Sequence, residues 1–353
     1  MTRPAGQQMA AEIAEQPAVL ARLAADGGPA IVARAIAGRR PRFVLLAARG
    51  SSDNAALYAK YLVEVRLGLP AGLVSPSAMT VYGARPDLRE VLFLAVSQSG
   101  SSPDLIDSLA AARGCGALTV AVTNDPASEL AQAAEFAVDV RAGAERSVAA
   151  TKSYTAELLA LYLLLMPLAA GAPDGRQLAE QATALAEAAR VNLDQPAAVA
   201  ELAERYRLID RLLITARGFS YPTAREAALK LMETCYLGAQ AFSGADLLHG
   251  PMAMVDARLP VLAIVTPGAG GRAMLAVLER LRQRQAELVV VGGLPGGTPG
   301  EPPVLPVSTE GLPEELFPVV EILPLQQLSY QLARLRGADP DAPRGLAKVT
   351  RTW

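Results

Sequence analysis

The chain repeats one pattern at the scale of a whole domain. Residues 43–52 are an apolar run that ends in Ala48-Arg49-Gly50 and two serines, and residues 212–220 repeat it down to the Ala-Arg-Gly triplet. A helical pattern follows the triplet in both places, and short aliphatic runs alternate with helical patterns in each half. Strands that alternate with helices predict a parallel sheet with helices on both faces. A repeat of this size indicates duplication, so we expect two similar α/β sheets.

The length of 353 residues agrees with two domains of ordinary size. We predict an N-terminal helix in residues 1–28, a first domain in 29–168, a helical connector in 169–206 and a second domain in 207–337. Near the end of the second domain, residues 317–323 are expected to form a strand and residues 326–336 a helix. The last segment, residues 338–353, has no regular period, and its sequence suits either disorder or packing for a specific reason.

Composition restricts the class of protein. Hydrophobic residues make up 51% of the chain and the formal net charge is −2 without a basic block, so nucleic acid and anionic membrane surfaces are not expected as partners. Cys115 and Cys235 are far apart, which argues for a reducing compartment and against a structural zinc site. The chain start lacks an apolar signal core, and the apolar run at 158–166 is shorter than the ~20 residues that span a bilayer. We therefore expect a soluble cytoplasmic protein of the size of an enzyme, and because the sequence contains no metal-ligand cluster and no nucleotide fingerprint we expect no metal and no cofactor.

A serine-rich turn follows the apolar run at 91–96. It reads Ser97-Gln98-Ser99-Gly100-Ser101-Ser102-Pro103, and a helical pattern comes directly after it. The free N–H groups and the dipole of a helix start attract anions, and small hydroxyl side chains can donate hydrogen bonds to them. The turn contains no Lys or Arg, which suits a phosphorylated small molecule better than a nucleotide with its metal. The alternative is a capped loop with surplus serines.

The corresponding turn of the second half, residues 266–271, offers few hydroxyls. We therefore expect one phosphate site, in the first half.

Three charged residues share one face of the helix predicted at 223–236. Glu226, Lys230 and Glu233 are spaced by four and by three, among apolar neighbours. This spacing suits a lined pocket, or else a solvated face with ion pairs worth ~0.2–0.5 kcal/mol each. A carboxylate in a pocket could abstract a proton next to a carbonyl, because burial raises its pKa toward neutrality.

Two further residues could carry chemistry. His249 is the one histidine, and the following Gly-Pro places it on a loop or at a helix end, where it is either a surface residue or a catalytic acid–base. Lys348 is the one lysine of the tail. It is either a solvated lysine or, if the tail folds back into a pocket, a desolvated amine able to form a Schiff base with an open-chain sugar.

The chain resembles the SIS (sugar isomerase) family, and within it the isomerase half of the glutamine–fructose-6-phosphate amidotransferases. The resemblance extends from Glu12 to Lys348 and implies two tandem, doubly wound, flavodoxin-like domains with an ordered C-terminal tail. Six motifs carry it, in the family's order: Gly50-Ser51-Ser52, Ser97-Gln98-Ser99-Gly100, Val148-Ala149-Ala150-Thr151-Lys152, Glu226-Ala227-Ala228-Leu229-Lys230-Leu231-Met232-Glu233, His249-Gly250-Pro251 and Leu346-Ala347-Lys348.

The resemblance implies roles for these residues. Glu233 would move a proton between C1 and C2 of the sugar, while Glu226 and Lys230 position the open chain. Lys348 would carry an imine, and His249 would open the ring from the neighbouring subunit of a homodimer. The phosphate would be held by Ser52, Ser97, Gln98, Ser99 and Ser102, and the sugar by Ser51, Val148, Ala150 and Ala347.

The sequence also departs from the family. Ala150 stands where a serine is usual near the sugar, Leu248 stands where a lysine is usual before the histidine, and no glutaminase motif precedes the first helix. Without that nitrogen source the expected direction is breakdown: glucosamine 6-phosphate to fructose 6-phosphate and ammonia. The alternatives are aldose–ketose isomerisation of another phosphosugar, cleavage of a phosphorylated amino-acid–sugar adduct, or a sugar-phosphate sensor without turnover.

Overall fold

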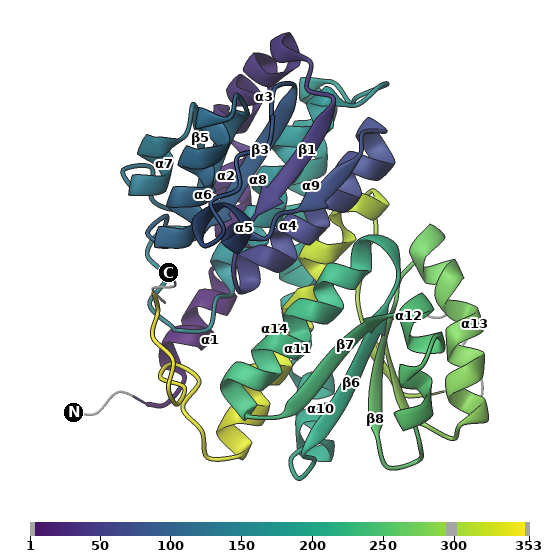
Figure 1. Ribbon diagram of the computed structural model, residues 1–353. Helices are drawn as coiled ribbons and strands as arrows, with labels where there is room; N and C mark the ends of the chain where they lie inside the picture. Colours follow the sequence, from purple (N-terminus) through teal and green to yellow (C-terminus); the bar gives the residue numbers. More distant parts are fainter. Residues whose placement is uncertain (1–3, 294–301, 350–353) are drawn as a thin grey trace. The chain divides into compact units, whose positions relative to one another are not determined.

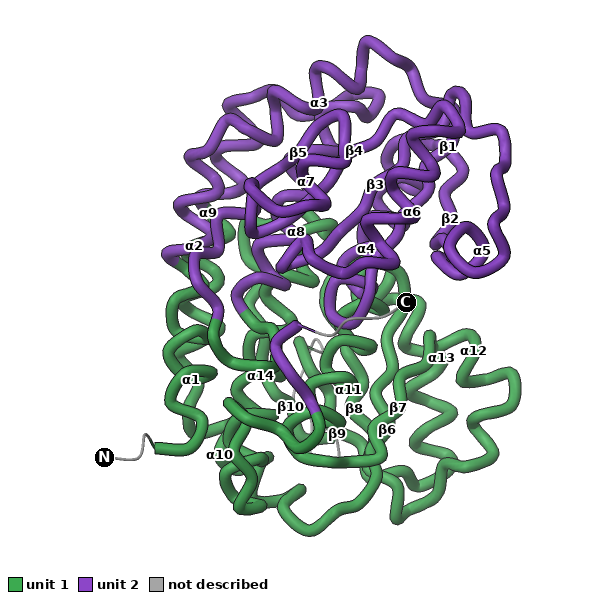
Figure 2. The backbone as a smooth tube through the Cα atoms, turned by 60° about the vertical axis from the view of Figure 1, so that its left-hand side comes forward, with its two compact units in different colours: residues 1–17, 146–151, 184–345 green, residues 18–145, 152–183, 346–353 purple. Residues whose placement is uncertain are grey.

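The structure is a computed structural model that describes residues 4–293 and 302–349 (Figure 1). It divides into two compact units, each assembled from separate stretches of the chain (Figure 2). Unit 1 comprises residues 1–17, 146–151 and 184–345, and unit 2 comprises residues 18–145, 152–183 and 346–353. Each unit contains one five-stranded parallel sheet, so the duplication predicted from the repeat is present.

The sheet of unit 2 has the strand order β2-β1-β3-β4-β5, and all its pairs are parallel. Strand β3 is central and almost wholly buried, which explains its continuous apolar sequence. Ser97 pairs with Thr123 in the register of β3 and β4, so the serine-rich turn leaves the carboxyl edge of the sheet. The strands are β1 (Phe43–Ala47), β2 (Ala71–Leu73), β3 (Val91–Ser97), β4 (Leu118–Thr123) and β5 (Phe136–Asp139).

Helices cover both faces of this sheet, as the alternation predicts. On one face α8 packs against α3 and α4, and on the other α6 packs against α5 and α7. The core of the second face consists of aliphatic and small side chains around Phe93, Leu105 and Leu109. The helices are α2 (Gln16–Ala24), α3 (Gly28–Arg39), α4 (Ser51–Leu62), α5 (Pro76–Thr80), α6 (Pro103–Gly114), α7 (Glu129–Ala133) and α8 (Lys152–Leu165).

The sheet of unit 1 has the order β7-β6-β8-β9-β10, which matches the first sheet strand for strand. Its strands are β6 (Arg211–Ala216), β7 (Gly238–Ser243), β8 (Pro260–Val265), β9 (Glu287–Gly292) and β10 (Val304–Pro306). Its helices are α1 (Gln7–Ala14), α10 (Pro196–Arg205), α11 (Tyr221–Cys235), α12 (Gly244–Leu248), α13 (Ala269–Gln283) and α14 (Phe317–Leu335). The connector predicted at 169–206 contains helix α9 (Gly175–Leu193) and α10, and the break between the two helices lies just before Pro196.

The strand predicted at 317–323 is wrong, because these residues begin α14. The run is apolar because α14 is buried along most of its length, against α10 and α11. A short apolar run suits a buried strand and a buried helix equally, so periodicity does not separate them. The first helix is also two helices, α1 and α2, which meet at Glu15.

The tail beyond α14 is packed, although its described residues, 336–349, form no helix or strand. Asp339 accepts a hydrogen bond from the N–H of Gly6, and Asp341 accepts bonds from the N–H groups of Gln8 and Met9 at the start of α1. Farther along, the Arg344 guanidinium lies 3.8 Å from the centre of the Tyr236 ring. These contacts order residues 338–345 of unit 1. Within the described chain, no helix is both long and apolar enough to cross a bilayer.

Candidate functional site

The serine-rich turn lies at the carboxyl end of β3 and leads into α6. Gly100 has φ +60°, and a Cβ atom there would stand 2.1 Å from Oγ of Ser128, so the turn requires glycine. Ser102 occupies the N-cap position of α6, but its side chain makes no capping hydrogen bond. Gln98, Ser99 and Ser102 are half-buried, whereas Ser97 is buried and accepts a hydrogen bond from the N–H of Gly100. The turn therefore has the conformation expected of an anion-binding site at the start of a helix.

A second turn with serines lies beside it, because β1 and β3 are neighbouring strands. Ser51 and Ser52 begin α4, and Oγ of Ser52 donates a 2.9 Å hydrogen bond to Oε1 of Glu157 in α8. Arg49 forms a 2.8 Å ion pair with Asp104, which is in the first turn of α6. Strand pairing and this ion pair place both predicted phosphate-binding segments at one edge of the same sheet.

Lys348 belongs to the same unit and is held by a buried carboxylate. Its Nζ atom lies 2.6 Å from Oε2 of Glu145, whose side chain is fully buried, while 23% of the lysine side chain is exposed. Glu145 also accepts hydrogen bonds from Ser153 at the start of α8, one helical turn before Glu157. The solvated alternative for Lys348 is therefore wrong, since the tail folds back onto unit 2.

The charged residues of α11 form an ion-pair cluster inside unit 1. Lys230 is 1% exposed, and its Nζ atom lies 3.4 Å from Oε1 of Glu226, which is fully buried. The same Nζ lies 2.5 Å from Oε2 of Glu233, whose side chain is 22% exposed. The solvated-face alternative is wrong for Glu226 and Lys230. The cluster presents one partly accessible carboxylate, Glu233, backed by a buried ammonium group.

The remaining predicted residues occupy loops. His249 ends α12 and is exposed, and Val148 and Ala150 are half-buried in the 146–151 segment of unit 1. Ala347 is exposed in the tail segment of unit 2. The predicted residues are thus divided between the two units. That they form one active site stays a prediction.

The second sheet does not reproduce the serine-rich turn of the first. At the start of α13, the carboxylate of Glu314 accepts hydrogen bonds from the N–H groups of Ala269 and Gly270, at 2.9 and 2.8 Å. A Cβ atom on Gly268 would lie 2.4 Å from the Glu314 carboxyl carbon. The protein's own carboxylate therefore occupies the helix start that corresponds to the predicted phosphate site of the first copy; that the chain has one phosphate site, in the first half, stays a prediction.

A buried carboxylate also closes the neighbouring turn of the second copy. Glu321 of α14 accepts hydrogen bonds from the hydroxyls of Ser220, Thr223 and Thr266. Burial raises the pKa of the Glu321 carboxyl above its ordinary value, although the three hydroxyls act in the opposite direction. Ser220 and Glu321 correspond to Ser52 and Glu157 of the first copy.

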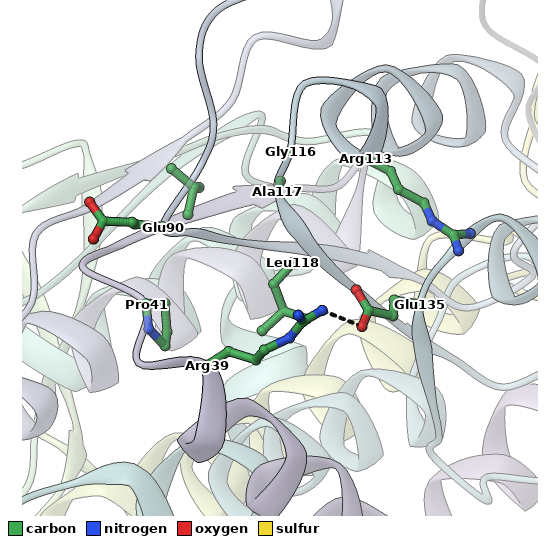
Figure 3. A pocket seen from close by; sticks show the side chains of 9 residues that line it. Arg39, Pro41, Glu90, Arg113, Gly116, Ala117, Leu118 and Glu135 are labelled. Carbon is green, nitrogen blue, oxygen red and sulfur yellow. Dashed lines mark hydrogen bonds and ion pairs between the residues drawn. The ribbon is translucent and has the colours of Figure 1, made fainter.

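A surface pocket of about 330 Å³ lies at the opposite edge of the first sheet (Figure 3). Val91 and Leu118, the first residues of β3 and β4, line it together with the ion pair of Arg39 and Glu135. None of the predicted site residues lines this pocket. In open α/β sheets ligands bind outside the carboxyl ends of the strands, so the pocket is set apart from the candidate site.

Sequence reasoning missed four residues that organise unit 2: Arg49, Asp104, Glu145 and Glu157. Arg49 stands directly before the Gly50-Ser51-Ser52 motif, and its repetition as Arg217 was the available signal. Glu157 is a carboxylate followed by a long apolar run, a pattern that indicates a buried hydrogen-bonded group, whereas Glu145 stands beside Arg146 and gave no such signal. Within the described ranges, no group of three or more His, Cys, Asp or Glu side chains could hold a metal ion.

Comparison with known proteins agrees with this architecture. A glutamine–fructose-6-phosphate aminotransferase (isomerizing) of Gloeobacter violaceus is 35% identical over 313 residues, which are 86% of this chain and 51% of that protein. The enzyme of the same name from Thermus thermophilus is 34% identical over 355 residues, 96% of this chain and 58% of that protein. The chain thus spans about half the length of the curated relatives it matches.

Solved structures match over nearly the whole chain. A Silicibacter pomeroyi protein, provisionally assigned as a phosphosugar isomerase, has a TM-score of 0.83 at 34% identity and covers 94% of this chain and 99% of its own. The C-terminal domain of the Francisella tularensis glucosamine–fructose-6-phosphate aminotransferase has a TM-score of 0.83 at 25% identity, with 94% and 97% covered. The SIS domain family matches residues 39–167 and 207–335. The chain therefore belongs to the SIS domain family and carries two copies of that domain.

Proposed function

We propose that this protein converts glucosamine 6-phosphate into fructose 6-phosphate and ammonia by proton transfer between C1 and C2 of the open-chain sugar. The observation that carries the proposal is the buried cluster on α11. Lys230 and Glu226 are sealed from solvent, whereas Glu233 is partly accessible. A carboxylate held in this way can take a proton from a carbon next to a carbonyl and return it to the neighbouring carbon.

The phosphate group would be bound by unit 2. The turns at 50–52 and 97–102 offer neutral donors at the start of two helices, on neighbouring strands of one sheet. A phosphate bound there would hold C1 and C2 of the sugar at a fixed position relative to the catalytic side chains. Binding of a remote group in this way lowers the entropy that must be lost on reaching the transition state.

The proposed reaction has three steps. Glu233 removes the proton from C2 of the open-chain amino aldehyde and delivers it to C1, while one proton of the amino group passes to O1; this leaves an alcohol at C1 and an imine at C2. Lys348 attacks C2 and ammonia leaves, so that the lysine nitrogen replaces the substrate nitrogen in the imine. Water then hydrolyses the lysine imine, which yields fructose 6-phosphate and restores the amine. His249 would open the sugar ring from a second subunit of a homodimer, in keeping with its exposed position.

The relatives support the choice of substrate. The Gloeobacter violaceus and Thermus thermophilus relatives are named as enzymes that transfer an amino group to fructose 6-phosphate and isomerise the sugar. The proposed reaction uses the same hexose 6-phosphate and moves the amino group in the opposite direction.

The test is a substrate panel with the purified chain. Glucosamine 6-phosphate is supplied, and ammonia and fructose 6-phosphate are measured together. Equal amounts of both products are expected. Ammonia-free conversion of glucose 6-phosphate or another phosphosugar would support plain isomerisation instead. Tight binding of hexose 6-phosphates without turnover would support the sensor alternative.

A further inference from the structure

Glu145 occupies a position that the sequence did not mark as functional. It lies in the loop after β5, and its carboxylate is fully buried. Oε1 accepts the backbone N–H of Ser153 at 3.0 Å, and Oε2 accepts the Ser153 hydroxyl at 2.7 Å. Ser153 is the second residue of α8, so the carboxylate sits where a helix start stabilises negative charge. The helix thus fixes this carboxylate independently of the tail.

The same oxygen that accepts the Ser153 hydroxyl also receives Lys348. The Nζ–Oε2 distance is 2.6 Å, and the lysine side chain is largely covered. A charge-assisted hydrogen bond to a buried and helix-anchored carboxylate fixes the position of a flexible lysine far better than an exposed pair would. The start of α8 therefore fixes Glu145, and Glu145 in turn fixes the amine of Lys348.

Helix α8 connects this pair to Ser52, one of the predicted phosphate-binding residues. Ser153 and Glu157 are four residues apart and share one face of α8, and Glu157 accepts the hydroxyl of Ser52. Both bonded groups lie in unit 2. The amine of Lys348 is thus held one helical turn from the residue that anchors the 50–52 turn.

We infer that Glu145 is the positioning residue of Lys348, and that it takes the proton which the amine must lose before it can attack the sugar. The inference rests on the proposed function. In the step, the ammonium proton moves from Nζ to Oε2, and the freed lone pair forms the N–C2 bond. Ammonia leaves C2 and accepts the proton from Glu145, so the carboxylate is restored when the ammonium ion departs.

Three variants test this role. Glu145→Gln keeps the shape of the side chain and removes its charge, while Glu145→Asp keeps the charge on a shorter side chain. Glu12→Gln is the matched control, because Glu12 is also a buried carboxylate that accepts backbone N–H bonds from the same loop, at Arg146 and Ser147. It loosens the loop without touching Lys348.

The first measurement is the rate at which borohydride traps fructose 6-phosphate on Lys348, followed by mass spectrometry. Glu145→Gln is expected to slow trapping by about a hundredfold, the contribution typical of a positioned proton acceptor. Its affinity for fructose 6-phosphate should stay near that of the wild type, Glu145→Asp should recover part of the rate, and Glu12→Gln should trap normally. Trapping at the wild-type rate in Glu145→Gln would overturn the inference.

A second measurement separates this inference from the proposed function. Reductive methylation of Lys348 by formaldehyde and a borane is followed in the ligand-free protein, with thermal unfolding as the check on folding. Loss of the carboxylate should speed methylation of Lys348 about tenfold, because the amine is then no longer held against Oε2 and, in the ligand-free protein, water takes its proton during attack on formaldehyde. Unchanged methylation in a folded Glu145→Gln protein would refute the positioning role. If positioning is seen but no sugar is trapped in the wild type, the proposed imine chemistry fails and the positioning role stands alone.

Discussion

Ser220 donates a 2.7 Å hydrogen bond to Glu321, as Ser52 donates one of 2.9 Å to Glu157 in the other copy. Each serine is the third residue of the repeated Gly-x-Ser turn, and each carboxylate comes from a long buried helix of its own unit. The duplicated fold has kept this bond in both copies. The two copies differ instead at the next turn, where Ser99 accepts the N–H of Ser101 in the first copy and Glu314 accepts the N–H groups of Ala269 and Gly270 in the second.

Replacement of Glu321 should change how stability depends on pH. Burial raises its pKa in the folded protein, so the folded state binds a proton more tightly than the unfolded state. The carboxyl therefore contributes most to stability below its unfolded pKa of about 4.5, and this contribution is lost as the pH rises through the folded pKa. Glu321→Gln should gain stability relative to the wild type as the pH rises above that value.

Chemical denaturation of both proteins between pH 4 and 8, read by circular dichroism, measures this difference. A constant difference across the range would show that Glu321 does not change its protonation on unfolding.

Loss of Glu314 should open an anion site in the second copy. Glu314→Ala removes the carboxylate that accepts the N–H groups of Ala269 and Gly270, and loss of such a helix cap costs about 1 kcal/mol. Added inorganic phosphate should then stabilise the variant more than the wild type, because it can occupy the freed helix start. Thermal unfolding over a phosphate titration measures this, and equal phosphate effects on both proteins would contradict the assignment.

The serine-rich turn should not tolerate a side chain at Gly100. Gly100→Ala places a Cβ atom against Ser128 in a left-handed conformation, whereas Gly83→Ala has a similar φ of +66° with no atom within 4 Å. The control should lose about 1 kcal/mol of stability from backbone strain alone. Gly100→Ala should lose a further ~1–3 kcal/mol from overpacking, together with phosphate binding. Denaturation and calorimetric titration with fructose 6-phosphate measure the two effects, and equal losses in both variants would show that the turn adapts.

The sequence predicted the duplicated sheets because apolar strands and the Ala-Arg-Gly turns leave a strong local signal. It failed at α14, where complete burial removed the helical periodicity that would have identified residues 317–323. It also missed β7, an edge strand of sequence Gly-Ala-Gln-Ala-Phe-Ser with little β-propensity.

The candidate site was predictable in part. Glu226, Lys230 and Glu233 are close in sequence, so helical spacing alone brought them together. The pairing of Lys348 with Glu145 joins residues 203 positions apart and depends on where the tail folds, which no local pattern encodes. The partners of Ser52 and Arg49, which are Glu157 and Asp104, were likewise set by packing of helices on the sheet.

The central claim is that Glu233 moves the proton between C1 and C2, and ammonia release from glucosamine 6-phosphate by Glu233→Gln tests it most directly. Glu279→Gln, the same change on an exposed helical carboxylate, serves as the control. We predict that the wild type and the control release ammonia at equal rates, and that Glu233→Gln loses at least about a hundredfold in rate while still binding the sugar phosphate. Ammonia release by Glu233→Gln at the wild-type rate, or no release by the wild type, would contradict the account.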